Sequence, residues 1–260
     1  MHPVPAPPVG EEARPLLAAQ HLEIGHGGRA LVPAISLVVH PSDSWVVVGR
    51  NGAGKSTLLR TLLGLLSPVA GRVTRAPGAT VVYVPQRVEL EPTVPMRGVD
   101  VVAMGLDAGW SFLRPWRRRG DRDAVAAAIA DVGAEAFAHQ RFETLSVGQQ
   151  QRLMLAQALV GQPALIILDE PTAAMDLIAE RDTLAVLARV RAARGCATML
   201  VTHRLSAGLR QAQHVVFLDA ESQTAVVGVP ATLLAHPVFQ QHFGGVPLGT
   251  APLQEATRGG

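Results

Sequence analysis

The nine residues GRNGAGKST (49–57) constrain this chain more than any other stretch, because they join two segments of different periodicity. Before them, WVVV (45–48) is a short apolar run typical of a buried strand, and after them STLLRTLLGLL (56–66) repeats its apolar residues at helical spacing. The loop also contains Lys55, the only lysine in a chain whose other basic residues are all arginine. Arginine meets every other demand for positive charge, so position 55 is chemically constrained.

Four loop residues, Gly49, Gly54, Lys55 and Ser56, fit the pattern G-x-x-x-x-G-K-[ST] in its required setting between a strand and a helix. Glycines allow backbone N–H groups to wrap a triphosphate, and the helix adds its positive end. The lysine supplies a compact charge where a branched guanidinium would not fit, and the serine can ligate Mg²⁺. The alternative is a chance glycine-rich turn. We interpret the loop as a triphosphate site, which also includes Asn51, Gly52 and Thr57.

Two adjacent carboxylates follow the apolar run ALIILD (164–169). Asp169, at the carboxyl end of this predicted strand, is placed to hold Mg²⁺ through water. Glu170, the next residue, is placed to polarise an attacking water as a general base. An Asp-Glu pair can also simply end a strand, so the interpretation depends on the phosphate loop being nearby.

A third element is ETLSVGQQQRLMLAQAL (143–159), in which Ser146 is a good N-cap for a helix with apolar periodicity. A serine and Gly148 at an exposed helix start can bind an anion. Taken alone, a capped core helix without any ligand is the better interpretation.

Composition limits the class of protein. The net charge is +2, which does not favour nucleic acid as the main partner. Apolar runs such as ALIIL (164–168) are too short to cross a bilayer, and the amino terminus lacks the features of a signal peptide. The single cysteine, Cys196, fits a reducing compartment and a buried, inert thiol.

The pattern along the chain predicts an α/β fold with a mainly parallel sheet covered by helices. Residues 1–16 and 246–260 are expected to be a flexible lead and tail, and 17–245 the folded domain. Residues 87–160 change to a helical, alanine-rich character and are a candidate inserted lobe. Strands are expected at 21–24, 34–39, 45–48, 71–75, 80–84, 164–169, 197–202 and 214–219, and a further helix at 177–193.

The chain resembles the ATP-binding subunits of ABC transporters in three motifs and their order: the phosphate loop, then LSVGQQQR (145–152), then LIILDEP (165–171). The resemblance covers about residues 21–243. It implies a P-loop NTPase core, an antiparallel β subdomain on the amino-terminal side, and ATP with Mg²⁺ as cofactors. It also implies further site residues: Gln86 as a sensor of Mg²⁺ and of the membrane partner, His203 on the γ-phosphate, Asp176 reaching across a dimer, and Ser146, Gly148 and Gln149 as the signature that closes on a second chain's nucleotide.

Two positions depart from the family's usual pattern. Val147 stands where glycine is common, and a β-branched residue would be strained there if the backbone needed a positive φ. With a helical φ, valine would only add bulk. His26 stands where a tyrosine usually stacks on adenine; its smaller ring predicts weaker and somewhat pH-sensitive nucleotide binding, unless it is a plain loop histidine.

The resemblance implies an ATPase that dimerises head to tail around two Mg-ATP and drives solute import. Expected partners are membrane permease subunits, a second copy or a paralogue, and an extracytoplasmic solute-binding protein, with the chain peripheral on the cytoplasmic side of the membrane. The segment 100–125 resembles that of zinc or manganese importers, and related subunits for metal chelates look similar. Alternatives are a soluble ABC-type ATPase without transport and a low-turnover regulatory module.

Overall fold

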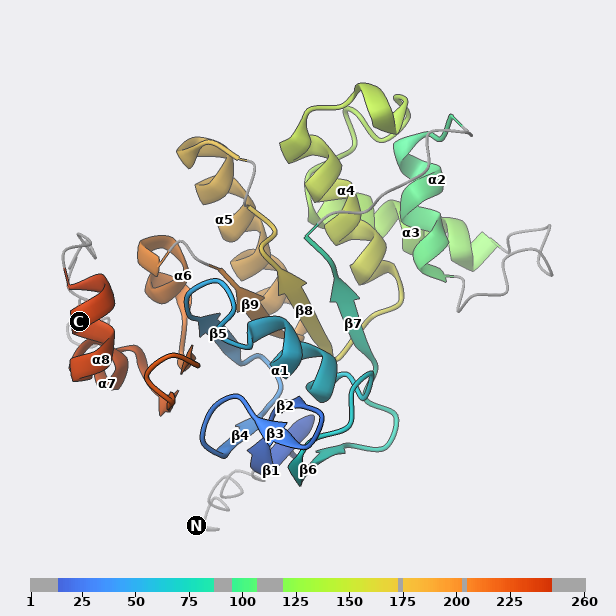
Figure 1. Cartoon of the computed structure of the whole chain (residues 1–260). Coiled ribbons are helices and arrows are strands. Elements are labelled where there is room, and N and C mark those ends of the chain that lie inside the picture. Colours follow the sequence, from blue (N-terminus) through green and yellow to red (C-terminus); the bar gives the residue numbers. More distant parts are fainter. Residues whose placement is uncertain (1–13, 87–94, 107–118, 173–174, 203–204, 245–260) are drawn as a thin grey trace, which may run out of the picture.

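A six-stranded sheet forms the centre of the computed structural model, which describes residues 14–86, 95–106, 119–172, 175–202 and 205–244 (Figure 1). The strands are parallel except that the last of them, β11, pairs antiparallel with β10. In spatial order they are β11 (Thr224–Gly228), β10 (His214–Asp219), β5 (Ser44–Val48), β9 (Ala197–Val201), β8 (Leu165–Asp169) and β7 (Val81–Val84). The predicted α/β class with a mainly parallel sheet is confirmed.

Alternate residues of each strand supply two separate cores, because successive side chains point to opposite faces of a sheet. In β5, Val46 and Val48 join one core, whereas Trp45 and Val47 join the other. Both faces are therefore covered, which explains why these strands are continuously apolar rather than alternating.

The first face carries α1 (Lys55–Leu62) and an antiparallel sheet of β4 (Ile35–Val39), β1 (Leu17–Glu23) and β6 (Ala70–Arg75). Leu58, Leu59 and Leu62 of α1 are buried in this core. A short hairpin, β2 (Gly25–His26) and β3 (Arg29–Ala30), follows β1. The antiparallel β subdomain thus fixes α1, and with it the phosphate loop, against the central sheet.

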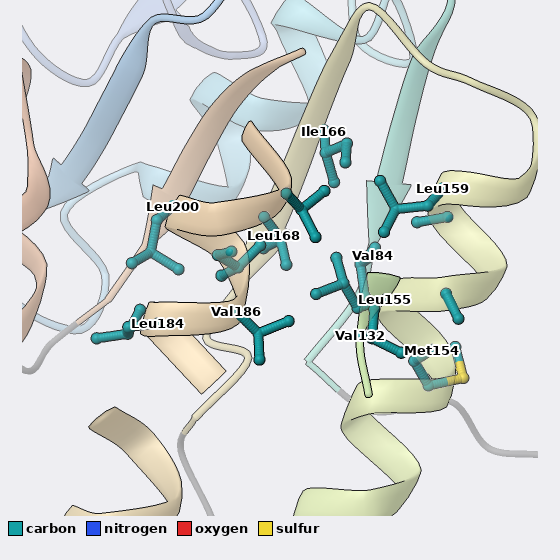
Figure 2. Packing of buried hydrophobic residues seen from close by; sticks show 14 of the residues in the cluster. Val84, Val132, Met154, Leu155, Leu159, Ile166, Leu168, Leu184, Val186 and Leu200 are labelled. Atoms are coloured by element: carbon teal, nitrogen blue, oxygen red, sulfur yellow. The ribbon is translucent and has the colours of Figure 1, made fainter. Parts of the chain in front are cut away.

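The second face is covered by helices, and Figure 2 shows their buried side chains meeting the sheet. Leu155 and Leu159 lie beside Val84 and Ile166. These helices are α4 (Val147–Val160), α5 (Leu177–Arg194), α6 (Leu205–Gln211), α7 (Pro230–Leu234) and α8 (Pro237–Phe243). No helix in the described part of the chain combines the length and the hydropathy needed to cross a membrane.

The described residues between β7 and β8 are mainly helical; the bounds of an inserted lobe at 87–160 stay a prediction. Within the described residues, this helical block contains α2 (Gly98–Ala103), the 3-10 turn η1 (Met104–Leu106), α3 (Arg119–Asp131), the 3-10 turn η3 (Phe142–Thr144) and α4. Helix α4 packs against both α2 and α3 and also against the sheet, so it joins the block to the central core.

Several predicted boundaries are wrong. The first strand begins at Leu17 rather than at residue 21, and a bulge near His21, whose φ is 45°, interrupts its alternation. Helix α1 ends at Leu62 rather than at residue 66, because Gly64 turns the chain at a φ of 77°. Strand β11 and the helices α6, α7 and α8 were not predicted.

Candidate functional site

The predicted phosphate loop connects the end of β5 directly to the first residue of α1. Gly54 takes a φ of 98° at the helix N-cap, a conformation that other residues rarely adopt. At Gly49 a Cβ atom would collide with the carbonyl oxygen of Leu218 on the neighbouring strand β10. The loop is therefore held against the sheet edge in a shape that needs glycine at both ends.

Lys55 is the first residue of α1 and is only 8% exposed. Its ammonium nitrogen donates hydrogen bonds to the carbonyl oxygens of Gly49, at 2.8 Å, and Arg50, at 2.9 Å. Among the described residues, these bonds use two of its three N–H donors. Burial lowers the pKa of Lys55, and the nearby charges of Glu170 and Asp169 oppose that shift. The space between these two loop carbonyls suits a compact ammonium better than a planar, branched guanidinium.

The phosphate loop and the predicted carboxylates line one cavity of about 570 Å³, which is within the roughly 300–1,000 Å³ usual for small-molecule sites. Parallel strands bring this about, because β5 and β8 both end at the same edge of the sheet with β9 between them. The cavity is lined by His26, Leu31, Asn51, Gly52, Gly54, Lys55, Ser56, Thr57, Gln86, Asp169 and Glu170. Residues more than a hundred positions apart in the sequence thus line one cavity.

Each of the two carboxylates has a partner from the end of β7. The Tyr83 hydroxyl donates a hydrogen bond to Asp169 Oδ2 at 3.0 Å, and the Gln86 amide donates one to Glu170 Oε2 at 3.1 Å. Burial raises the pKa of Asp169; the bond from Tyr83 opposes that shift, and the charge of Glu170 adds to it. Two acidic groups are therefore held close together in a partly buried setting.

Glu170 has an unusual backbone conformation for its residue type. Its φ is 46°, and its N–H donates to the carbonyl oxygen of Val201 on β9 at 2.9 Å. A non-glycine residue with positive φ is uncommon and carries strain that the surrounding structure must hold. The tie to β9 fixes the direction in which this side chain leaves the sheet.

His26 lies at the other end of the cavity, in the β2–β3 hairpin. Its Nε2 atom is 3.4 Å from the Thr57 hydroxyl, and Leu31 lines the cavity beside it. The ring is exposed and stands at the side of the phosphate loop. This placement is compatible with stacking on a base, which remains a prediction.

The start of α4 has the geometry of a capping box. Ser146 accepts a hydrogen bond from the N–H of Gln149, and the Gln149 side chain accepts one from the N–H of Ser146. Val147 is the first helical residue, so its backbone has no left-handed strain; its side chain is 51% exposed. Gly148 has room for a Cβ atom, which would meet Ala179 Cβ at 3.9 Å. None of these residues lines the cavity around Lys55.

The last two predicted site residues have different outcomes. Asp176 is the N-cap of α5, and its carboxylate accepts hydrogen bonds from the N–H groups of Ile178 and Ala179. It is exposed, and its reach into a second chain stays a prediction. His203 lies outside the described residues, between β9 and α6.

The donor set suits a magnesium triphosphate. Ser56 and Asp169 offer hard oxygen ligands, which Mg²⁺ prefers together with waters and phosphate oxygens. In the described part of the chain no three His, Cys, Asp or Glu side chains gather to hold a metal ion by themselves. The loop N–H groups and the buried ammonium complement phosphate charge, so these residues fit Mg²⁺ brought in with a nucleotide.

Sequence reasoning missed two features of the site. Leu31 gave no signal beyond an apolar residue in a loop. Tyr83 is the chain's only tyrosine and stands three residues before Gln86, a signal that could have been used. Arg50, also in the phosphate loop, forms an ion pair with Glu221 at an N–O distance of 2.9 Å. Both side chains are exposed, so this pair contributes little to the stability of the fold.

Comparison with known proteins agrees with this geometry. The family described as ABC transporter matches residues 32–173. The zinc import ATP-binding protein ZnuC of Cereibacter sphaeroides is 37% identical over 88% of this chain and 88% of its own length. ZnuC of Paracoccus denitrificans is 37% identical over 93% of this chain and 90% of its own.

Among solved structures, that of a metal-chelate type ABC transporter in an inward-facing conformation aligns with a TM-score of 0.78 at 24% identity. It covers 89% of this chain and 90% of its own, and it supports the fold. The motifs, the loop geometry and the extent of these matches lead to one conclusion: this chain belongs to the ABC transporter family.

Proposed function

We propose that this chain is the ATP-hydrolysing subunit of a metal-ion importer of the zinc class. The observation that carries the proposal is the cavity in which the phosphate loop, with Lys55 and Ser56, faces Asp169 and Glu170. The relatives named as zinc import ATP-binding proteins over most of the chain support zinc as the cargo. The folded unit is residues 17–245, with 87–160 as its helical lobe, peripheral on the cytoplasmic side of the membrane.

In this proposal, Lys55 and the loop N–H groups bind the phosphates of ATP. Ser56 and Asp169 would hold Mg²⁺, which supplies neutralisation of phosphate charge when bound. Glu170, aimed by its backbone bond to Val201 and by the Gln86 amide, orients the attacking water as general base. His203 is assigned to the γ-phosphate on the family resemblance.

A second copy completes the site. The capped start of α4, with Ser146, Gly148 and Gln149, does not line its own chain's cavity, so it is proposed to close on the nucleotide of a partner, with Asp176 at the same interface. ATP then joins two chains head to tail, and hydrolysis removes the contact that holds them. Permease subunits and an extracytoplasmic binding protein complete the importer.

Replacing Glu170 with Gln tests the ATPase part. The expected result is a stable ATP-bound dimer on size-exclusion chromatography and loss of ATP hydrolysis. Asp123→Asn, at an exposed position, is the control: it should still hydrolyse ATP and therefore elute as a monomer. Unchanged hydrolysis by the Glu170 variant would contradict the assignment of the base.

The cargo needs its own test. Mass spectrometry of what copurifies with the chain from native membranes should find a multi-span permease, and uptake of radioactive zinc should fail in cells that carry only Glu170→Gln. A soluble dimer that copurifies with no membrane protein would refute the importer. If cells that carry only Glu170→Gln still took up zinc but failed to take up another metal, zinc would be refuted as the cargo.

A further inference from the structure

Tyr83 and Asp169 are brought together by strand pairing rather than by nearness in sequence. Strands β7 and β8 are parallel neighbours, with Tyr83 opposite Ile167. The Tyr83 ring therefore lies beside the carboxyl end of β8, and its hydroxyl bonds Asp169 Oδ2 at 3.0 Å. Nothing in the phosphate-loop chemistry requires this bond.

The chemistry of this pair fixes which group donates and which accepts. The Tyr83 phenol O–H donates, and the Asp169 carboxylate oxygen accepts, at 3.0 Å. Lys55 and Arg60 bring positive charge near the same carboxylate.

The end of β7 also controls the second acid. Gln86, three residues beyond Tyr83, bonds Glu170 at 3.1 Å. One four-residue stretch, YVPQ (83–86), thus contacts both adjacent carboxylates through two separate side chains. A rotation of either carboxylate must break a bond to this stretch.

We propose that Tyr83 is a positioning residue for Mg²⁺: its hydroxyl holds Asp169 Oδ2 and thereby turns Oδ1 toward the hydration shell of the ion. This inference rests on the proposed function, because it concerns the metal that accompanies ATP. It assigns to the hydroxyl alone a role that the phenyl ring cannot perform.

The first test is Tyr83→Phe, which keeps the ring and removes the hydroxyl. Loss of a hydrogen bond to a charged group should raise the Mg²⁺ concentration for half-maximal ATPase activity by about tenfold. Turnover at saturating Mg²⁺ should stay within about twofold of the natural protein, because Glu170 and Lys55 are untouched. Binding of ATP in the presence of a chelator should not change.

Ser222→Ala is a matched control. The Ser222 hydroxyl also donates to a strand-end carboxylate, that of Asp219 on β10 at 2.8 Å, but neither residue lines the cavity around Lys55. This variant should leave the Mg²⁺ dependence as it is. A shift equal to that of Tyr83→Phe would show that loss of any such bond loosens the sheet edge, and would overturn the proposal.

A second measurement does not depend on turnover. Because the chain has one tyrosine, ¹³C labelling of tyrosine Cζ gives a single resonance without assignment. In the nucleotide-free protein this resonance should differ between the natural chain and Asp169→Asn, and in the natural chain it should move again when Mg²⁺ is added to the ADP complex. The inference would be refuted if the resonance were the same in the natural chain and in Asp169→Asn and also did not move when Mg²⁺ is added to the ADP complex.

The two proposals fail in different ways. If the natural chain hydrolyses Mg-ATP and Tyr83→Phe has the same Mg²⁺ dependence, only the role of Tyr83 is wrong. If the natural chain neither binds nor hydrolyses Mg-ATP, the proposed function is wrong, and the role of Tyr83 falls with it.

Discussion

Gly148→Ala should separate what the fold needs from what the function needs. Gly148 is the second residue of α4, has no left-handed backbone, and leaves 3.9 Å between a new Cβ and that of Ala179. Alanine is more favourable than glycine within a helix by about 0.5–1 kcal/mol. At about 2–4 °C per kcal/mol, the melting temperature should rise by roughly 1–4 °C.

Activity should fall in the same variant. The added methyl group would stand on the surface that is proposed to close on the partner's nucleotide. Overpacking a close contact costs about 1–3 kcal/mol, which corresponds to roughly a 5- to 150-fold loss of turnover. ATP binding by the separate chain should not change, because Gly148 does not line that cavity.

Gly120→Ala is the matched control, because Gly120 is also the second residue of a helix, α3, and a Cβ there meets nothing within 4 Å. Both variants should gain similar stability, measured by calorimetry, and only Gly148→Ala should lose ATPase activity. Full activity in Gly148→Ala at concentrations that support dimers would refute the assignment of this helix start to a second nucleotide.

Three further predictions concern the cavity itself. Lys55→Arg should nearly abolish ATP hydrolysis in a phosphate-release assay, because a guanidinium does not fit between the loop carbonyls; surviving activity would show that the lysine is not constrained by space. His26→Tyr should tighten binding of a fluorescent ATP analogue by several-fold through a larger stacking face, whereas His139→Tyr, outside the cavity, should have no effect. The raised pKa of Asp169 means that the native state holds its proton more tightly than the unfolded chain, so this group's contribution to stability falls as the pH rises through the window above 3.8. Asp169→Asn removes that fall, so its melting temperature without nucleotide, taken relative to that of the natural chain, should increase as the pH rises above 3.8; a constant difference would contradict the burial argument.

Local motifs account for the part of the site that could be predicted. Strand, glycine loop and helix are contiguous in sequence, so the geometry around Lys55 follows from residues 45–62. Asp169 could be placed as well, because parallel strands end at a common edge. The same reasoning missed Tyr83, since its contact with Asp169 depends on β7 being the neighbour of β8 across the long helical block.

Fold boundaries failed where tertiary contacts outweigh local preference. Ala18 and Ala19 have low strand propensity, yet β1 includes them because it pairs with β4 on one side and β6 on the other. Helix α8 has seven residues, which is too few for a helix to be stable alone. It is held by Phe239, whose ring packs edge-on against that of Phe217 on β10, with the ring centroids 5.5 Å apart. Pro230 and Pro237 stand at the starts of α7 and α8, where proline is favoured, so the sequence contained a pattern that could have predicted both short helices.

The insertion of the helical block between two neighbouring strands has an evolutionary consequence. The chain leaves the sheet after Val84 and returns at Leu165, on adjacent strands, so the block can be replaced without changing the order of the strands. Among the described residues, the lining of the cavity around Lys55 includes Gln86, just before the block, and no residue of the block itself.

Such an exchange must respect one boundary. Leu155 and Leu159 of α4 are buried against Val84 and Ile166 (Figure 2), and cutting a buried leucine to alanine costs about 2–5 kcal/mol. A chimaera that takes residues 87–160 from a relative should fold when it keeps the apolar side of α4. The order of the strands therefore lets the block change while the residues around Lys55 stay the same.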